Sequence, residues 1–145
     1  MKALIWLFIA TCLFGCAATV PKFENLQSTK STVAVVYIYR MHNHSDRNAY
    51  PYIYIDGIQR DRLRDNGYVI YELEPGKRKI SIESKGSLIW NAKNSFVLEP
   101  TLDANNLYFF ELSVSSESRF EVFYSFQQVS ELEALQKLKT LNLSQ

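Results

Sequence analysis

Between residues 33 and 126 the chain consists of short apolar or alternating runs, separated by turn-forming residues about every ten positions. The strongest run is VAVVYIYR, Val33–Arg40, which has β-branched and aromatic residues at successive positions. Such a run predicts a central strand that is buried on both faces. Other runs alternate between apolar and polar residues, as in KRKISIES over residues 77–84. The pattern predicts an all-β fold, an antiparallel β-sandwich of about seven or eight short strands.

Pairs of turn-forming residues mark the connections between these strands. Asp56-Gly57 separates Tyr50–Ile55 from Ile58–Leu63 and predicts a tight hairpin, because both central residues of such a turn favour positive φ. Asn66-Gly67 and Pro75-Gly76 are further pairs of turn-forming residues and predict two more turns between strands. The remaining predicted strands are Tyr68–Leu73, Leu88–Trp90, Ser95–Leu98, Leu107–Val114 and Phe120–Phe126.

A helical pattern is found at the C-terminal end. Ser130 precedes Glu133 by three positions, which is the spacing of a capping box. Leucines then recur at every third position, at Leu132, Leu135, Leu138 and Leu141. The pattern predicts a helix within residues 129–145 that packs its leucine stripe on the sandwich, in preference to a partner.

The N-terminal residues have the composition of an export signal. Lys2 precedes an uncharged apolar run, Ala3–Phe14, which is too short to span a bilayer as a helix. Leu13-Phe14-Gly15-Cys16 follows and resembles a bacterial lipobox, in which the cysteine is acylated and becomes the mature N-terminus. Phe14 departs from that pattern, since a smaller residue is usual there. The alternatives are cleavage after Ala18 and a buried first strand.

These signals divide the chain into four parts. We expect a lipoprotein signal peptide at residues 1–15, a lipidated flexible tether at 16–32, a β-sandwich domain at 33–128 and the helix at 129–145. The tether is rich in small and polar residues, as is usual between a lipid anchor and a domain. The alternative for this segment is an N-terminal edge strand around Phe23.

Charge and cysteine content exclude several functional classes. Without Lys2 the mature chain has 15 basic and 15 acidic residues, a balance that excludes a nucleic-acid-binding surface. Cys12 leaves with the signal and Cys16 is lipidated, so no cysteine remains for a disulfide, a zinc site or a thiol nucleophile. No cofactor is expected.

One loop carries residue types that bind metals. His42, His44 and Asp46 provide two imidazoles and a carboxylate, although a metal ion needs further ligands from elsewhere. A solvated loop is the simpler interpretation, and so is turn chemistry for the acidic residues Asp56, Asp61 and Asp65. We therefore expect no enzymatic activity. A metal-handling or hydrolytic accessory protein built on the His42/His44 loop remains the alternative.

Basic and aromatic side chains gather on the hairpin around Asp56-Gly57. Arg60, Arg62 and Arg64 alternate and would share one face of a regular strand, which suits an anionic partner. The aromatic residues Tyr50, Tyr52 and Tyr54 line one face of the preceding strand. A solvated face and ordinary sheet packing are the structural alternatives for these two groups. Arg40, at the end of a buried strand, is expected to anchor a carboxylate or backbone carbonyls.

The order of these motifs resembles that of a known family. VYIYR, YIYIDG and NGYVIYELEPGKRKISI are similar to the domain of unknown function 2846, found in small bacterial envelope proteins, and the Pro-Gly unit also resembles PEGA-type β-sandwich modules. The likeness extends from Val33 to about Phe126 and weakens after Ser84. The residues of this sequence that match the family's pattern are Tyr37, Tyr39, Arg40, Asp56, Gly57, Gly67, Tyr68, Pro75, Gly76 and Lys77. The resemblance implies a β-sandwich in the cell envelope and provides no catalytic residues.

The sequence thus predicts an envelope lipoprotein that acts as a binding or adaptor module. Acyl chains on Cys16 would hold it at the membrane, because two or more chains anchor a protein stably. Ala17 follows Cys16 with no acidic residue, which resembles sorting to the outer membrane, facing the periplasm. The inner membrane is the alternative. The expected partner is an envelope protein or a glycan.

Overall fold

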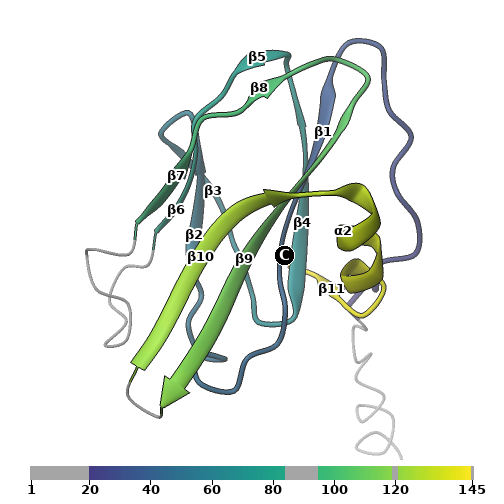
Figure 1. Ribbon diagram of the computed structural model, residues 1–145. Coiled ribbons are helices and arrows are strands. Elements are labelled where there is room, and N and C mark those ends of the chain that lie inside the picture. Colours follow the sequence, from purple (N-terminus) through teal and green to yellow (C-terminus); the bar gives the residue numbers. More distant parts are fainter. Residues whose placement is uncertain (1–19, 84–94, 119–120, 145) are drawn as a thin grey trace, which may run out of the picture.

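The computed structural model describes residues 20–83, 95–118 and 121–144 (Figure 1). The predicted signal peptide at 1–15, the lipidation site Cys16 and the predicted strand Leu88–Trp90 lie outside these residues. The strands are β1 (Ala34–Arg40), β2 (Tyr52–Ile55), β3 (Ile58–Arg62), β4 (Gly67–Leu73), β5 (Gly76–Lys77), β6 (Ile80–Glu83), β7 (Phe96–Leu98), β8 (Thr101–Leu102), β9 (Leu107–Ser118), β10 (Glu121–Val129) and β11 (Asn142–Leu143). The helix α2 (Glu131–Leu138) lies between β10 and β11.

Two sheets form the body of the fold (Figure 1). A five-stranded sheet has the order β10-β9-β1-β4-β11, and a four-stranded sheet has the order β3-β2-β6-β7. The short strands β5 and β8 pair separately. The predicted all-β sandwich with a C-terminal helix is therefore confirmed.

Two of the strand pairings are parallel, which the expected antiparallel pattern did not include. β1 pairs parallel with β9, with Val35 opposite Leu107, and β11 pairs parallel with β4, with Asn142 opposite Gly67. Parallel neighbours need a long crossover connection. Here the chain between β1 and β9 supplies that crossover and includes all strands of the four-stranded sheet.

The main core lies between the two sheets. Val36 and Ile38 of β1 are fully buried against the four-stranded sheet, whose inward residues include Ile53 and Ile82. This arrangement follows from the alternation of the sequence, because successive side chains of a strand point to opposite faces. The same alternation leaves Tyr52 and Tyr54 on the outer face of β2, where they are half-buried.

A second core covers the other face of the five-stranded sheet. Tyr37 and Tyr39 of β1 are fully buried there, although they alternate with residues of the main core. Tyr37 stacks on Phe109 of β9, with ring centroids 5.2 Å apart. Because both faces of β1 are covered, this strand is the central buried strand that the sequence predicts.

The helix is shorter than the predicted 129–145 segment, and the predicted leucine stripe packs on the domain except at Leu132. Ser130 caps it as expected, since its hydroxyl accepts a hydrogen bond from the Glu133 amide at 3.3 Å. Leu138 and Leu141 are fully buried in the second core with Ala134, and Leu135 packs against it, whereas Leu132 is 73% exposed. A spacing of three residues drifts around a helix of 3.6 residues per turn, which explains why the first leucine of the stripe lies off the packing face. After the helix, the chain pairs with β4 as β11.

The expected flexible tether is wrong for residues 20–30. Phe23 is buried, and its ring lies edge-on to Tyr37 and Tyr68 with centroid distances of 6.3 and 5.7 Å. Further along, the amide of Gln27 donates to the Tyr37 hydroxyl at 2.7 Å, and Lys30 forms an ion pair with Glu72. The segment is therefore fixed to the domain by an aromatic side chain within a polar stretch.

In the part of the chain that the structure describes, no helix has the length and apolar character needed to cross a membrane.

Candidate functional site

A buried arginine, Arg40, organises the end of the sandwich where β1 finishes. Arg40 is fully buried, and its guanidinium donates to the carbonyl oxygens of Ala49 and Asp46, at 2.8 and 3.1 Å. The same group lies 3.3 Å from the Asp46 carboxylate and 3.2 Å from that of Asp65. The sequence prediction that Arg40 anchors a carboxylate and backbone carbonyls is confirmed.

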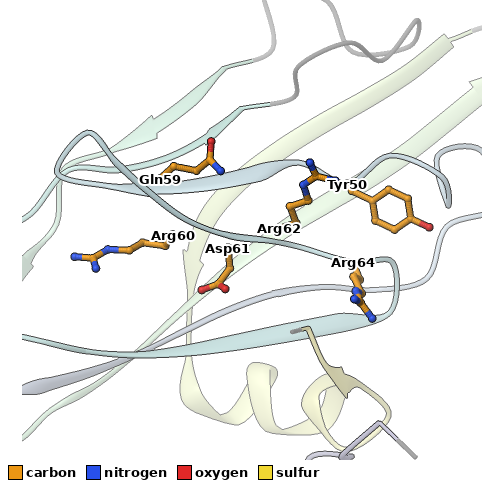
Figure 2. A pocket seen from close by; sticks show the side chains of 6 residues that line it. All are labelled: Tyr50, Gln59, Arg60, Asp61, Arg62 and Arg64. Atoms are coloured by element: carbon orange, nitrogen blue, oxygen red, sulfur yellow. The ribbon is translucent and has the colours of Figure 1, made fainter. Parts of the chain in front are cut away.

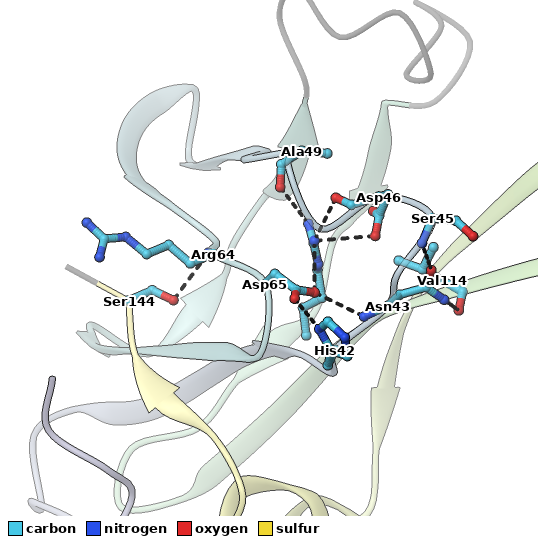
Figure 3. Close-up of polar contacts among 10 residues, drawn as sticks. His42, Asn43, Ser45, Asp46, Ala49, Arg64, Asp65, Val114 and Ser144 are labelled. Carbon is cyan, nitrogen blue, oxygen red and sulfur yellow. Dashed lines mark hydrogen bonds and ion pairs between the residues drawn. The ribbon is translucent and has the colours of Figure 1, made fainter.

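Asp65 connects this arginine to the histidine loop (Figure 3). One carboxylate oxygen, Oδ1, accepts hydrogen bonds from Arg40 and from the Asn43 amide, the latter at 3.0 Å. The other oxygen, Oδ2, forms a close contact with His42 Nδ1. The sequence pattern favours a turn role for Asp65, because nothing in the local sequence shows that the loop after β3 meets the loop after β1.

The two carboxylates around Arg40 have pKa values shifted in opposite directions. Burial raises the pKa of Asp46, and the favourable charge of Arg40 and a hydrogen bond from Tyr124 offset this only in part. Burial also acts to raise the pKa of Asp65, but hydrogen bonds from His42, Asn43 and Arg40 outweigh it and hold the value below the ordinary range. Asp65 is therefore the carboxylate that remains ionised at lower pH.

The three candidate metal ligands do not meet at one point, although the two histidines are neighbours. His42 faces Asp65, His44 lies edge-on to His42 with ring centroids 4.5 Å apart, and Asp46 faces Arg40. Within residues 20–83, 95–118 and 121–144, no three His, Cys, Asp or Glu side chains form a group that could hold a metal ion. The contacts of Asp46 and Asp65 are those of a structural network.

The other carboxylates considered from the sequence are also held apart. Asp56 accepts hydrogen bonds from the Lys79 amide and the Arg78 guanidinium, at 2.9 and 3.0 Å. The bond from the Lys79 amide is the main reason that the pKa of Asp56 is lowered. Asp61 instead accepts a hydrogen bond from the Tyr71 hydroxyl at 2.7 Å. Each carboxylate has its own structural partner, as expected from turn chemistry rather than from an acid–base pair.

The predicted arginine and tyrosine surface lies on β3, an edge strand whose five residues are all exposed (Figure 2). The strand is irregular. Tyr52 is opposite Arg62 and Tyr54 is opposite Gln59, so two steps on β2 correspond to three on β3. This β-bulge breaks the alternation. The expectation that the three arginines share one face of a regular strand is therefore wrong, and their side chains point in different directions (Figure 2).

The bulge instead arranges these side chains around an open groove of about 500 Å³. Its lining contains Tyr50 and all three arginines, together with two residues that the sequence analysis did not select. The full lining is Tyr50, Gln59, Arg60, Asp61, Arg62 and Arg64. An irregular polar strand gives no sequence signal for its bulge, so Gln59 and Asp61 could not be assigned to this surface from the pattern.

The two tyrosines of β2 contact groove residues on the neighbouring strand β3. The Arg62 guanidinium lies 4.5 Å from the centre of the Tyr52 ring and also contacts its hydroxyl. Tyr54 hydrogen-bonds through its hydroxyl to the Gln59 side chain, at 3.3 Å. Tyr50, by contrast, lines the groove and is 46% exposed. Tyr52 and Tyr54 therefore position groove residues, whereas Tyr50 is accessible to a ligand.

Arg60 and Arg64 are the groove cations without a partner side chain. With the described residues their guanidinium groups form neither an ion pair nor a hydrogen bond, although the Arg64 amide donates to the Ser144 hydroxyl. The single carboxylate of the lining, Asp61, is already hydrogen-bonded by Tyr71. The groove thus presents positive charge and an aromatic ring, a combination that suits planar anionic groups.

Comparison with known proteins assigns the chain to a family. No curated protein matches the chain. A family model described as "Protein of unknown function (DUF2846)" matches residues 30–125, which include β1 to β9 and the whole lining of the groove. Because this match extends over more than half of the 145 residues, the chain belongs to the DUF2846 family.

Proposed function

We propose that the protein is a non-enzymatic binding module of the cell envelope, anchored by an acylated Cys16, and that the groove on β3 holds an anionic group of its partner. The observation that carries the proposal is the pair of arginines, Arg60 and Arg64, which line an open groove and form no ion pair with a residue that the structure describes. Arginine in this situation forms bidentate hydrogen bonds with carboxylates or phosphates. The partner would be an envelope protein or a glycan that carries such a group.

A comparison with the other arginines of the molecule supports the groove as the binding site. Arg40 and Arg78, which have structural roles, each contact carboxylates and backbone carbonyls at 3.4 Å or less. The groove arginines lack such contacts and lie on an edge strand, where backbone groups are also accessible. The alternative of a hydrolytic or metal-handling protein finds no comparable support, because the His42 loop is engaged in the Arg40 network.

Site-specific photo-crosslinking in intact envelopes tests the groove. A photoreactive residue replaces Gln59, which lines the groove, or Gln127, which is exposed on β10. We expect a defined adduct from position 59 that position 127 does not give. The adduct should be lost in the Arg60→Gln/Arg64→Gln variant and retained in the control variant Lys77→Gln/Lys79→Gln. Equal adducts from the two positions, or an adduct that survives the loss of both arginines, contradict the proposed groove.

The anchor has a separate test. Replacing Cys16 with Ser should abolish fatty-acid labelling and retention in the membrane fraction. If the unlabelled variant still fractionates with membranes, the proposed lipidation is wrong, whereas the groove proposal depends only on the cross-linking result.

A further inference from the structure

The first described residues are fixed to one end of the sandwich. The Leu143 amide donates to the carbonyl of Pro21 at 2.8 Å, and the Phe23 amide donates to that of Leu141 at 3.2 Å. Lys22 pairs with Asn142 of β11 between these two contacts. The chain that arrives from Cys16 therefore enters the domain beside β11, at the lower end of the molecule in Figure 1.

Three other segments join β11 to form one continuous surface at this end. The Arg64 amide donates to Ser144 Oγ at 3.2 Å, and the Asn66 side chain donates to the carbonyl of Thr140 at 3.2 Å. The loop after β1 joins them, because the Asn43 amide donates to Asp65. The C-terminal end of α2, the loop between β3 and β4 and the histidine loop thus surround the point where the chain enters.

This surface carries unpaired positive charge. Its exposed basic side chains form no ion pair with any residue that the structure describes, and they are Lys22, Arg47, Arg64 and Lys139. Asp46 and Asp65 belong to the same end, but both are paired with the buried Arg40. Glu24, two residues after Lys22, is an exposed carboxylate on the same segment. We call the four basic residues the basic end.

At the opposite end of the sandwich three basic residues are paired, whereas the exposed Lys79 forms no ion pair with a residue that the structure describes. Lys30 lies 2.6 Å from Glu72, Lys77 lies 2.5 Å from Glu99, and Arg78 lies 3.0 Å from Asp56. Among the residues that the structure describes, the basic end therefore has four unpaired basic side chains, compared with Lys79 at the opposite end and Arg60 on β3. In a chain with balanced total charge, this is an uneven distribution of charge between the two ends.

The distance to the proposed anchor is short. Cys16 and Val20 are separated by four residue steps, which span at most about 14 Å at roughly 3.6 Å per residue. An acylated Cys16 sits at the membrane interface, where the headgroup layer is roughly 5–8 Å thick on each side. The basic end is thus the part of the domain that the anchor would hold beside the membrane surface.

We infer that the basic end binds the phosphate headgroups of anionic phospholipids in the membrane that holds the anchor; this inference rests on the proposed acylation of Cys16. Phospholipid phosphates supply the negative charge that the four side chains lack, and a basic residue near an anionic surface contributes roughly fivefold to the partition. The binding sets the orientation of the domain and places Arg64 at the membrane-proximal end of the β3 groove.

The experiment uses the acylated mature chain in vesicles and a quencher attached to lipid headgroups. A fluorescent dye is placed on Thr140→Cys, at the basic end, or on Thr101→Cys, at the opposite end; both positions are exposed. In vesicles with about 30% phosphatidylglycerol, which carry a strong surface charge, we expect at least about threefold stronger quenching at position 140 than at position 101. In pure phosphatidylcholine the difference should shrink.

A matched pair of charge variants makes the test specific. Replacing Lys22, Arg47, Arg64 and Lys139 together with Gln should remove the effect of phosphatidylglycerol on quenching, whereas Lys30→Gln/Lys77→Gln should retain it. Equal quenching at the two dye positions in an acylated chain overturns this inference and leaves the anchor standing. A mature chain whose mass carries no acyl groups overturns the anchor, and the inference fails with it.

Discussion

The guanidinium of Arg40, at the end of the central strand, lies 3.2 Å from the carboxylate of Asp65, in the loop that leads from the four-stranded sheet to the five-stranded sheet. The side chain of Arg40 is fully buried and that of Asp65 is 15% exposed. This contact fixes the crossing point of the chain between the two sheets. It also positions Arg64, the neighbouring residue, at the groove.

Removing Arg40 should destabilise the fold strongly. In Arg40→Met, the buried Asp46 carboxylate loses its compensating charge, and breaking a buried ion pair from one side costs about 3–5 kcal/mol. Urea unfolding measures the change. Arg47→Gln, in the same loop but exposed, is the control and should stay within about 0.5 kcal/mol of the unaltered chain. Equal effects of the two substitutions would show that the Arg40 network contributes little.

The two carboxylates of this network should respond to acid with opposite signs. The folded-state pKa of Asp65 lies below its ordinary value of 3.8, so its contribution to stability is present above that value and is lost as pH falls through the folded pKa. The folded-state pKa of Asp46 is raised above 3.8, so its contribution is present below that value and is lost as pH rises through the folded pKa.

Unfolding curves between about pH 5 and pH 2 test these signs. Asp65→Asn should lose less stability on acidification than the unaltered chain, because the variant no longer has this carboxylate to protonate. Asp46→Asn should lose more, because the stabilising proton uptake of the native state is gone. Parallel pH profiles for the two variants would contradict the assignment.

The contact of Phe23 with two tyrosines should be a substantial part of the stability. Phe23→Ala removes a buried ring that lies edge-on to Tyr37 and Tyr68, and such truncations cost about 3–5 kcal/mol. Hydrogen exchange should quicken at the Gln27 and Leu143 amides, which the segment protects. Val20→Ala, at a position 46% exposed, is the control and should change neither measurement. Unchanged exchange in the Phe23 variant would show that the segment is not held by this ring.

The helix face is tested by two leucines of the same pattern. Leu138 is fully buried and Leu132 is 73% exposed. We expect Leu138→Ala to cost about 2–5 kcal/mol, because it leaves a cavity beneath the helix. Leu132→Ala should stay within about 0.5 kcal/mol of the unaltered chain, since surface substitutions rarely exceed this. Thermal unfolding of both variants gives the comparison, and a comparable loss in each would show that Leu132 also packs on the domain.

Of the three groove arginines, we expect only Arg62 to contribute to the stability of the fold. Arg62→Ala removes the stacking on Tyr52 and should cost about 0.5–1 kcal/mol. Arg60→Gln and Arg64→Gln, which remove no contact with the described residues, should each stay within about 0.5 kcal/mol of the unaltered chain. The urea concentrations at which the three variants are half unfolded, measured under the same conditions, test this expectation. A larger loss in either Gln variant would mean that the side chain has a structural role.

The sequence predicts the parts of this fold that depend on local pattern. VAVVYIYR predicts a strand buried on both faces, and β1 is such a strand. The Asp56-Gly57 turn is also confirmed, since the two residues have φ values of 53° and 79°. Asn66 has a φ of 53° as well, but β3 and β4 lie in different sheets, so no hairpin is closed there. A Cβ on Gly67 would overlap the Ser144 hydroxyl, so close approach explains this glycine.

The features that the pattern missed depend on partners far away in the chain. Periodicity shows that β1 is buried but not that its neighbours are β4 and a parallel β9. A single Phe23 in a polar stretch has no period, and its burial follows from the cavity that Tyr37 and Tyr68 create for it. The groove was anticipated in its arginines and Tyr50, whereas its shape arises from a bulge in a strand that is polar on both sides.

The position of β1 between β4 and β9 also determines when the protein can fold. The first strand made is central, and its partner β9 begins at Leu107 and lies about seventy residues later in the chain. The Pro21 and Phe23 contacts need Leu143 and Leu141, which are made last. Contacts of such high sequence separation slow folding, because the chain must close long loops before it gains them. On the export route that we propose, the central sheet would not be complete until β9 has emerged, which would keep the chain unfolded during its passage.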